Sequence, residues 1–380
     1  MIRIFNNFLR LLFIARTLAR HDALFFLDNF ERLPLYVVLL RKIMPVFALG
    51  ATRSKDLRDG ERLANALREL GPSFIKLGQA LSVRADLIGE EMVLDLGNLR
   101  DRLPPFSFEK ARETIEYELE APLEELFADF NPEPVAAASI AQVHFATVRE
   151  TVPAPTEADP DAKEEVLRDV AVKILRPGVE SAFESDLQLF FWLAELAERY
   201  QPHFRRLRLT KIVETMADSV ELEMDLRMEA SAASEMAENF ADDPAFGVPE
   251  IDWQRTARRV MTQSRVDGIS ISRKEELVAA GHDLKALGDN VIRVFLHQVL
   301  RDGFFHADMH HGNLFVTADG RLVAVDFGIM GRMSRETRLF MAEMLHAFLT
   351  RDYKRAAEIP RQFRAGLPVH RRADSRPSGQ

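Results

Sequence analysis

Two nearby segments decide the fold of this chain: Phe305-His306-Ala307-Asp308-Met309-His310-His311-Gly312-Asn313 and Val325-Asp326-Phe327-Gly328. Four residues separate Asp308 from Asn313, and Asp326 opens an Asp-Phe-Gly triplet. Carboxylate and amide oxygens are hard ligands of the kind that magnesium prefers. We therefore interpret Asn313 and Asp326 as magnesium ligands. A carboxylate at Asp308 is suited to orient a nucleophile or to accept its proton.

A short hairpin is predicted between these two segments. Leu314–Val316 and Leu322–Val325 are apolar and flank the turn Ala318-Asp319-Gly320. The hairpin places both magnesium ligands on one edge. An Asp, four residues, an Asn and a later Asp-Phe-Gly form the pattern of the phosphoryl-transfer loop of protein kinases. An Asp-Phe-Gly triplet occurs often by chance, but both elements in this order with a hairpin between them argue against two unrelated turns.

An apolar strand that ends in lysine lies upstream, at Val170-Ala171-Val172-Lys173. It matches the Val-Ala-Ile-Lys pattern, in which the lysine holds the α- and β-phosphates of ATP. A lysine after a strand is usually a solvated end, so the order of the motifs along the chain carries this assignment. The lysine requires a glutamate partner on a helix. We choose Glu229 as that partner, with Glu221 and Glu223 as alternatives.

The segment before this strand departs from the ordinary kinase pattern. A glycine-rich loop is expected there, because glycine allows the backbone to approach phosphates closely. The chain instead has Ala136-Ala137-Ala138-Ser139. Alanine favours helical geometry, so alone this segment reads as a helix start or a tight turn. Because it precedes a strand and then Lys173, we interpret it as the phosphate-covering loop in altered form.

The composition narrows the class of function. The 380 residues are 47% hydrophobic, which suffices for a sizeable core in two or three subdomains. A formal net charge of −9 disfavours nucleic acid as a partner, because phosphate binding needs a basic face. The absence of cysteine excludes disulfides, thiolate nucleophiles and cysteine metal sites. His306, His310 and His311 also allow a zinc interpretation, but magnesium explains the Asp and Asn pattern better.

The N-terminal 50 residues are apolar and are predicted to be helical. They lack a small-residue cleavage site, and Arg10 and Arg16 interrupt them, which is atypical of a signal peptide. Arg41 and Lys42 lie near the middle of the richest apolar stretch, so we predict no spanning helix there. Two interpretations remain open. We favour ordinary core helices over an amphipathic segment that lies on a membrane surface.

Apolar periodicity predicts mostly helices elsewhere. The helical pattern over residues 61–84 is interrupted by Gly71-Pro72, which predicts two helices. The other predicted helices are residues 91–102, 108–127, 183–200, 209–240, 287–302 and 333–351, and the predicted strands are 140–148, 169–174 and 258–265. Residues 151–165 are predicted to form a solvated hairpin loop, and the polar tail from Arg361 is predicted to be frayed.

Two polar clusters have no counterpart in ordinary kinases: Lys76-Leu77-Gly78-Gln79, and Glu221-Leu222-Glu223-Met224-Asp225. For each alone, a solvated helix face is the simpler interpretation. Lys76 and Gln79 share a helix face, and burying them without partners would be costly. We hypothesise that they enter the active-site mouth, where Glu223, Asp225 and Asp326 are available as partners.

These elements, in this order, resemble the UbiB family of atypical kinase-like proteins, which is linked to ubiquinone biosynthesis. The resemblance covers approximately residues 61–332. In the family's terms, the KxGQ motif is Lys76, Gly78 and Gln79; the alanine-rich loop is Ala136, Ala137, Ala138 and Ser139; the ExD motif is Glu223 and Asp225; and the kinase-like set is Lys173, Glu229, Asp308, Asn313 and Asp326. His311 stands where the family often has proline.

The resemblance implies an α+β, two-lobed protein-kinase-like fold with an N-terminal helical extension. It implies an apolar helical segment at 1–60, the KxGQ extension at 61–130, an N-lobe at 131–265 and a C-lobe at 266–380. The extension would cover the face where a protein substrate would otherwise dock. Bacterial members usually continue into apolar C-terminal membrane segments, so we expect a truncated chain or a different mode of anchoring.

The implied activity is that of an atypical kinase-like ATPase that binds ATP and Mg²⁺ and supports ubiquinone biosynthesis. Its implied partners are lipid-like quinone precursors, a membrane surface and other ubiquinone-biosynthesis proteins, with a cytoplasmic location at the periphery of the inner membrane. The alternative is a nucleotide-gated lipid-binding or scaffolding protein with little turnover. A serine/threonine kinase is disfavoured, because the helical pattern at 333–351 leaves no long activation segment after Gly328.

Overall fold

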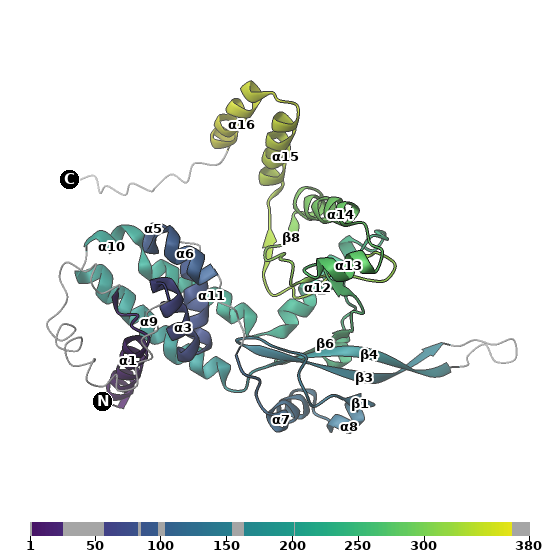
Figure 1. The fold of residues 1–380 in the computed structure, drawn as a ribbon, viewed down its shortest axis with the longest axis horizontal. Helices are drawn as coiled ribbons and strands as arrows, with labels where there is room; N and C mark the ends of the chain where they lie inside the picture. Colours follow the sequence, from purple (N-terminus) through teal and green to yellow (C-terminus); the bar gives the residue numbers. More distant parts are fainter. Residues whose placement is uncertain are drawn as a thin grey trace, which may run out of the picture. The chain divides into compact units, whose positions relative to one another are not determined.

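The computed structural model describes residues 2–25, 57–82, 85–97, 103–153, 163–200 and 202–366 (Figure 1). The chain divides into two compact units. Unit 1 consists of residues 1–230 and 251–265, and unit 2 consists of residues 231–250 and 266–380. In the residues that the structure describes, no helix has the length and apolar character needed to span a membrane.

Unit 1 contains a helical part. Its helices are α1 (Ile2–Arg20), α3 (Asp59–Leu70), α4 (Pro72–Ser82), α5 (Ala85–Ile88), α6 (Glu90–Gly97), α9 (Val179–Tyr200), α10 (Pro202–Leu207) and α11 (Leu209–Glu223). The predicted division of residues 61–84 is confirmed. Gly71, with a φ of 109°, ends α3, and α4 begins at Pro72, since proline suits a first helical position. The residues that form this core include Leu67, Leu70, Phe74, Ile75, Phe183, Leu189 and Val220.

The described part of the N-terminal segment packs into this core. Ile14 and Leu18 of α1 are buried in it. Arg10 forms a two-pronged ion pair with Asp186 of α9, with hydrogen bonds of 2.9 and 3.0 Å to the two carboxylate oxygens. For residues 10–25 the structure thus favours the core-helix interpretation. Residues 26–50 lie outside the described residues, and the membrane-surface interpretation stays a prediction.

Unit 1 also contains an antiparallel sheet covered by two helices. Its strands are β1 (Asp129–Phe130), β2 (Ala136–Ala137), β3 (Ala141–Pro153), β4 (Lys163–Leu175) and β6 (Val260–Ser264), in the order β1-β3-β4-β6 with β2 paired to β3. Helices α7 (Phe108–Leu119) and α8 (Leu123–Leu126) lie on one side of it (Figure 1). Val148, Val170, Val172 and Ile174 alternate along β3 and β4 and bury their side chains against Ile115 of α7.

Two predictions need correction in this unit. The strands of the β3–β4 hairpin are longer than predicted, because Thr151 pairs with Glu165 and Pro153 with Lys163 where a loop was expected. The single helix predicted over residues 209–240 breaks at Met224, giving α11 and α12 (Leu226–Asn239). Asp225 causes the second start, since its carboxylate accepts the main-chain N–H of Arg227 at 3.1 Å and thereby caps α12.

Unit 2 contains two small sheets. One has the order β5-β10-β9-β7, with β5 (Phe246–Gly247), β7 (Ile269–Ser270), β9 (Leu314–Val316) and β10 (Leu322–Ala324). The other pairs β8 (Phe304–His306) with β11 (Met330–Arg332). The predicted hairpin is confirmed, since Leu322 of β10 pairs antiparallel with Val316 of β9.

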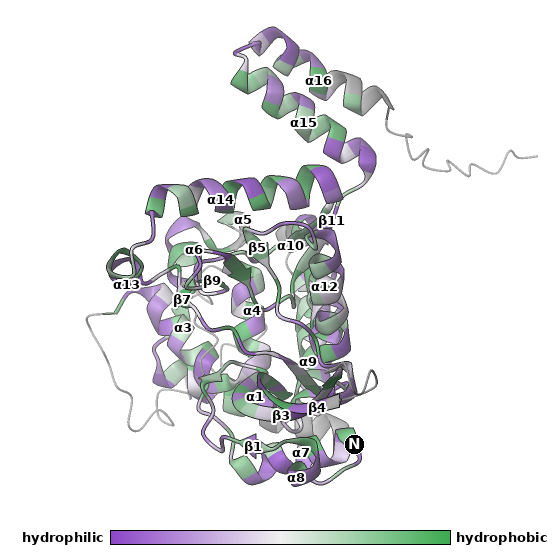
Figure 2. Ribbon diagram, turned by 90° about the vertical axis from the view of Figure 1, so that its right-hand side faces the viewer, coloured by the Kyte–Doolittle hydropathy of each residue, from purple (hydrophilic) through white to green (hydrophobic). Residues whose placement is uncertain are grey.

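The helices of unit 2 are α13 (Lys274–Ala279), α14 (Leu284–Leu296), a π-helical turn (His297–Asp302), α15 (Arg335–Leu349) and α16 (Tyr353–Gly366). Two helical regions match the predicted residues 287–302 and 333–351, whereas α13 and α16 were not predicted. Figure 2 shows polar and apolar residues alternating along α14. Phe340 of α15 packs on Phe363 of α16 with ring centroids 4.5 Å apart. The helix therefore continues past Arg361, where a frayed tail was predicted; residues 367–380 lie outside the described residues.

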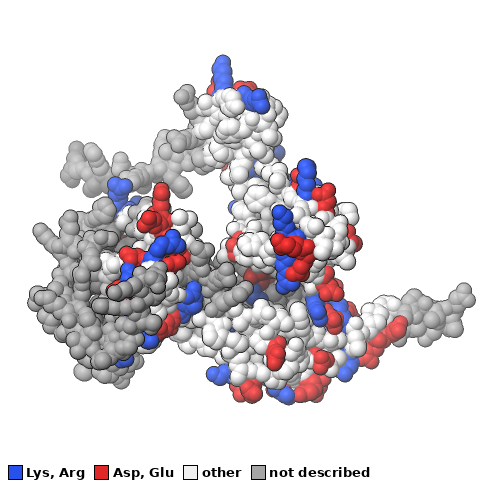
Figure 3. Space-filling model, in the orientation of Figure 1, with Lys and Arg blue, Asp and Glu red and all other residues white. Residues whose placement is uncertain are grey.

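Acidic and basic side chains lie intermingled on the face of the molecule drawn in Figure 3. Many of them form ion pairs within one unit. Examples are Arg259 with Glu180 at 2.6 Å in unit 1 and Arg293 with Asp243 at 2.6 Å in unit 2. In the second pair the Arg293 guanidinium lowers the pKa of Asp243. The arginine of each pair is partly exposed, and partly exposed pairs stabilise a protein weakly, so the pairs with both side chains buried matter more.

A buried histidine should make the stability of unit 1 depend on pH. His144 is fully buried; its Nδ1 donates to the carbonyl of Asn131 at 2.8 Å, and its Nε2 accepts from Gln142 at 2.9 Å. Burial lowers the pKa of His144. The unfolded chain therefore takes up a proton near about pH 6.5 that the folded chain does not, and the free energy of unfolding should fall as pH drops below that value.

Urea unfolding between about pH 7.5 and pH 5 measures this effect. The His144→Gln variant keeps an amide near Gln142 but cannot titrate. Its free energy of unfolding should fall less steeply with decreasing pH than that of the wild type, by up to about 1.4 kcal/mol per pH unit. Equal slopes for the two proteins would show that His144 does not contribute.

Candidate functional site

The loop after β8 holds Asp308 and Asn313 together through its own main chain. The N–H of His310 donates to the carbonyl of Asp308 at 2.9 Å, and the N–H of Asn313 donates to the carbonyl of His310 at 3.0 Å. The side-chain nitrogen of Asn313 also donates to the Asp308 carbonyl, at 3.3 Å. This bond uses the nitrogen end of the Asn313 amide, so its oxygen end remains suited to a cation. The Asp308 carboxylate is half exposed and open to a substrate.

Asp326 lies directly beside this loop. The N–H of Val325 donates to the carbonyl of Asn313 at 2.9 Å, so the two predicted magnesium ligands are neighbours in unit 2. Asp326 has a φ of 63°, in the left-handed region that residues other than glycine rarely adopt. Such strain of the order of 1 kcal/mol or more concentrates at functional sites. Phe327 is buried and anchors the turn, while the Asp326 side chain is exposed.

The buried side chain of His306 connects the Asp308 loop to the Asp-Phe-Gly turn. Its Nδ1 accepts the N–H of Asp308 at 3.2 Å, its Nε2 lies 3.5 Å from the carbonyl of Val325, and its ring packs on Phe327 with centroids 5.5 Å apart. Burial lowers the pKa of His306, although the Val325 carbonyl and the nearby carboxylates oppose this effect. A neutral His306 therefore acts as a spacer that sets the distance between the Asp308 loop and the Asp-Phe-Gly turn.

Unit 1 brings Lys173 and Glu229 together. Lys173 lies on β4 between Val143 of β3 and Met261 of β6, and its Nζ is 2.7 and 2.9 Å from the two carboxylate oxygens of Glu229 on α12. Both side chains are largely buried, at 18% and 8% exposed. Of the alternatives considered for this partner, Glu223 instead contacts Lys76, and Glu221 is exposed.

The alanine-rich segment forms a tight antiparallel turn and not a helix start. Ala136 and Ala137 form β2, which pairs with Val143 and Gln142 of β3, and the N–H of Ala138 donates to the carbonyl of Ala141 at 2.8 Å. The Ser139 hydroxyl is buried and has no hydrogen-bond partner. A buried polar atom without a partner is costly, so this loop is suited to gain a ligand there.

Arg176 is a residue of this region that the sequence analysis missed. It lies just past the end of β4, and its guanidinium donates to the carbonyl of Pro104 at 3.0 Å and contacts that of Ala138 at 3.4 Å. Burial lowers the pKa of Arg176. Arg176 thus ties the alanine-rich turn to the linker before α7. Its position three residues after Lys173 was the available signal, but a strand-end arginine is usually solvated.

The KxGQ and ExD motifs meet within unit 1. Lys76 Nζ of α4 is 2.8 Å from Glu223 Oε2 at the end of α11, and the two side chains are only 14% and 11% exposed. Asp225 instead accepts from the Arg227 guanidinium at 2.6 and 2.9 Å, which lowers the pKa of Asp225. Gln79 is half-buried on the same helix as Lys76, and its main-chain carbonyl accepts from the Ser82 hydroxyl. The entry of Lys76 and Gln79 into an active-site mouth remains a prediction.

Loss of the Lys76 side chain should destabilise unit 1. Glu223 would then be a buried carboxylate without its cation, which typically costs about 3 kcal/mol. We expect Lys76→Met to lower the free energy of unfolding by this order and the double variant Lys76→Met with Glu223→Gln to recover most of the loss. Urea unfolding of the four proteins in this cycle measures the coupling. A single variant as stable as the wild type would contradict the pairing.

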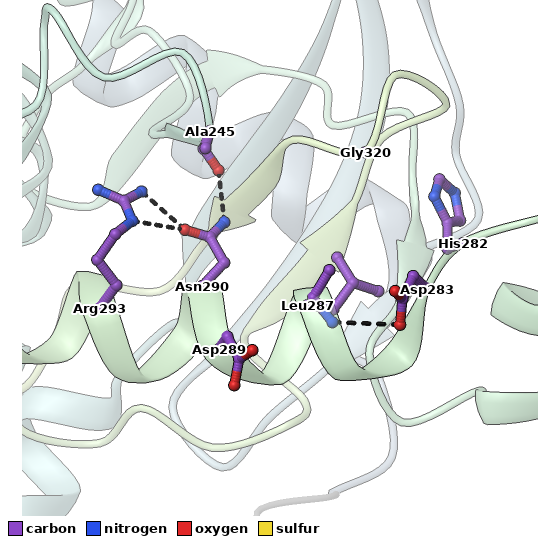
Figure 4. Close-up of a pocket in the computed structure, with 9 residues that line it drawn as sticks. Ala245, His282, Asp283, Leu287, Asp289, Asn290, Arg293 and Gly320 are labelled. Atoms are coloured by element: carbon purple, nitrogen blue, oxygen red, sulfur yellow. Dashed lines mark hydrogen bonds between the residues drawn. The ribbon is translucent and has the colours of Figure 1, made fainter.

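A separate pocket lies in unit 2 beside the first turns of α14 (Figure 4). It has a volume of about 470 Å³. Several of its polar groups already have partners: Asp283 caps α14 by accepting from Lys285 and Ala286, and the Asn290 side chain donates to the carbonyl of Ala245 at 2.9 Å. It includes none of the motif residues, so it is not part of the site described above.

Known proteins with similar sequences identify the family of this chain. The family model for the ABC1 atypical kinase-like domain matches residues 98–360. The chain belongs to the UbiB family of ABC1 atypical kinase-like proteins. A probable protein kinase UbiB from Marinobacter nauticus is 41% identical over 307 residues, which is 80% of this chain and 53% of that protein. Another from Shewanella pealeana is 40% identical over 330 residues, covering 86% and 57%.

This UbiB-family chain spans about half the length of the curated relatives that it matches. Among solved structures, the complex of Rv3197 with erythromycin from Mycobacterium tuberculosis matches 86% of this chain and 75% of its own, with a TM-score of 0.50 and 24% identity. At this identity the similarity concerns the fold alone. Together with the family match, it establishes the predicted α+β kinase-like fold.

Proposed function

We propose that this protein binds ATP with Mg²⁺ and hydrolyses it as an atypical kinase-like ATPase. The observation that carries the proposal is the main-chain bond from Val325 to Asn313, which holds the two hard oxygen ligands Asn313 and Asp326 side by side. Hard oxygen ligands of this kind bind Mg²⁺ together with phosphate oxygens. The half-exposed carboxylate of Asp308, five residues before Asn313, is available to orient the nucleophile.

We infer that Lys173 and the alanine-rich turn bind the phosphates of ATP. Lys173 would contact the α- and β-phosphates, with Glu229 fixing its position, as the lysine–glutamate pair of kinases does. The Ala136–Ser139 turn would cover the phosphates, and the buried Ser139 hydroxyl, which has no partner, is suited to a phosphate oxygen. Bound Mg²⁺ would supply charge neutralisation on the phosphates during transfer.

The membership of the UbiB family supports a place in ubiquinone biosynthesis. We infer that the protein acts on or handles lipid-like quinone precursors at a membrane surface, on the cytoplasmic side of the inner membrane and together with other proteins of that pathway. Arg16, Arg41 and Lys42 of the apolar N-terminal segment suit an anionic surface, whereas Arg10 is already paired with Asp186. Liposome flotation of the full chain and of a chain without residues 1–50 tests this part, because equal flotation would contradict it.

A nucleotide-gated lipid-binding or scaffolding protein is the second candidate. The buried Lys76–Glu223 pair favours it, because Lys76 already neutralises a carboxylate of the ExD motif. In that case ATP binding would change a conformation, and turnover would be slow. The two candidates differ in one measurement: phosphate release with Mg²⁺-ATP, with and without anionic liposomes and a quinone-precursor mimic.

The Lys173→Met variant tests the proposed ATP site. It should lower phosphate release by about 100-fold or more, because the phosphates lose their positioning cation. Glu229 would be left buried without its partner, so the double variant Lys173→Met with Glu229→Gln serves as a folded control for stability. Release at the wild-type rate by a folded Lys173 variant would contradict the assignment.

A further inference from the structure

The imidazole of His310 has no part in the function proposed above, yet it lies inside the loop that carries Asp308. Its main chain closes that loop by donating to the Asp308 carbonyl at 2.9 Å and by accepting from the Asn313 N–H at 3.0 Å. The adjacent carbonyl of His311 accepts from the Ser270 hydroxyl at 3.2 Å, which ties the loop to β7. The position of the His310 ring relative to Asp308 is therefore set by the loop itself.

The main chain also decides which nitrogen of His310 carries the proton. The N–H of Gly312 donates to Nδ1 of His310 at 2.9 Å. A main-chain N–H can only donate, so Nδ1 must be the unprotonated acceptor. In a neutral imidazole the proton then lies on Nε2, which becomes a donor.

The glycine at position 312 is required by the same ring. A Cβ atom on Gly312 would lie 2.7 Å from Cε1 and 2.9 Å from Nδ1 of His310, closer than real Cβ contacts allow. Gly312 is not among the glycines with a left-handed φ, so backbone conformation does not explain it. The loop thus omits a side chain where the His310 ring needs the space.

The donor nitrogen of His310 faces the carboxylate of Asp308. The distance from Nε2 to Asp308 Oδ2 is 3.8 Å, and both side chains are half exposed. This is longer than a hydrogen bond, but catalytic hydrogen bonds are often long without substrate and tighten in the complex. A small rotation of either side chain would close the gap.

We propose that His310 is a positioning residue, whose Nε2–H holds Oδ2 of Asp308 and leaves the other carboxylate oxygen for the nucleophile. The proposal rests on the proposed role of Asp308. The simpler alternative is that the ring only closes the loop by accepting the Gly312 N–H. Asparagine can perform that simpler task, because its side-chain oxygen lies near the place of Nδ1, but it offers no donor at the place of Nε2.

Steady-state ATP hydrolysis separates the two roles. In His310→Asn we expect kcat to fall by about tenfold or more, while KM for ATP and the melting temperature stay unchanged. In His310→Gln, which restores a donor near the place of Nε2, we expect part of kcat to return. His310→Asn should have no further effect in an Asp308→Asn background. The control His346→Asn changes a histidine on α15 of the same unit, outside this loop, and should keep the wild-type kcat. A wild-type kcat in His310→Asn would overturn the proposal.

A second readout does not depend on turnover. Two-bond ¹H–¹⁵N correlations of the histidine rings at about pH 8, where ordinary histidine is neutral, report the tautomer. The His310 signal, assigned by its loss in His310→Gln, should show Nε2 protonated and should shift in Asp308→Asn. Protonation on Nδ1 would overturn the proposal. If the wild type does not hydrolyse ATP, the proposed function fails, while the shift of the His310 signal in Asp308→Asn still tests this inference, because the ring that only closes the loop should show no shift.

Discussion

Asp326→Asn is expected to abolish the stabilisation of the protein by ATP with Mg²⁺. The main-chain bond from Val325 to Asn313 lies one residue before Asp326 and does not involve its side chain. The variant therefore removes a charge from the proposed magnesium pair and leaves Asn313 in place. An amide oxygen binds magnesium far more weakly than a carboxylate does. At a nucleotide concentration of about 100 times Kd, a binding site contributes about 2.7 kcal/mol of stability, and the variant should lose all of it.

The asparagine substitution is chosen because of the backbone at this position. Asp326 has a φ of 63°, a conformation that asparagine tolerates better than other residues with a side chain, so the fold should survive. Asp319→Asn is the matched control, since Asp319 is an exposed aspartate in the β9–β10 turn of the same unit. Thermal unfolding with and without Mg²⁺-ATP should show a shift for the wild type and the control only. A full shift in Asp326→Asn would refute the role of Asp326.

The parts of the site that the sequence predicted well are those in which local order determines geometry. The Asp308 loop, the β9–β10 hairpin and the Asp-Phe-Gly turn lie within about two dozen residues, and their main-chain bonds connect near neighbours. The division at Gly71-Pro72 is local for the same reason, because a left-handed glycine followed by proline ends one helix and starts the next.

Other features depended on pairing between distant residues. The alanines of Ala136–Ala137 favour a helix by propensity, but their pairing with Val143 and Gln142 on β3 imposes an extended turn. The β3–β4 strands extend to Pro153 and Lys163 because the register of the long hairpin continues, which a polar composition does not reveal. In each case tertiary pairing overrode local preference.

The break in the helix predicted at 209–240 had a visible signal that the periodicity obscured. Asp225 is a good capping residue, yet the apolar pattern continues across it.

The partner of Lys76 is a different case. Helix spacing predicted that Lys76 would need a carboxylate, but the choice of Glu223 over Asp225 depends on the Arg227 side chain, which already occupies Asp225. Only the three-dimensional arrangement decides between Glu223 and Asp225 as the partner of Lys76.

Asp308→Asn is expected to leave ATP binding intact and to lower the rate of ATP hydrolysis by about 1,000-fold or more. The loop should keep its shape, because the bonds from His310 and from the Asn313 side chain reach the main-chain carbonyl of Asp308 and not its carboxylate. The proposed magnesium ligands should therefore be unaffected. What is lost is the carboxylate that orients the nucleophile or accepts its proton.

Two measurements on the same sample test this expectation. Thermal unfolding with Mg²⁺-ATP should show the wild-type shift for Asp308→Asn, in contrast to Asp326→Asn, and phosphate release should fall to the level of the buffer. The contrast between the two variants is the critical result, because general damage to the loop would reduce binding and turnover together. Hydrolysis at the wild-type rate by Asp308→Asn would mean that another group activates the nucleophile. A loss of binding would mean that Asp308 contributes to the metal site, and its role would then have to be reassigned from the nucleophile to Mg²⁺.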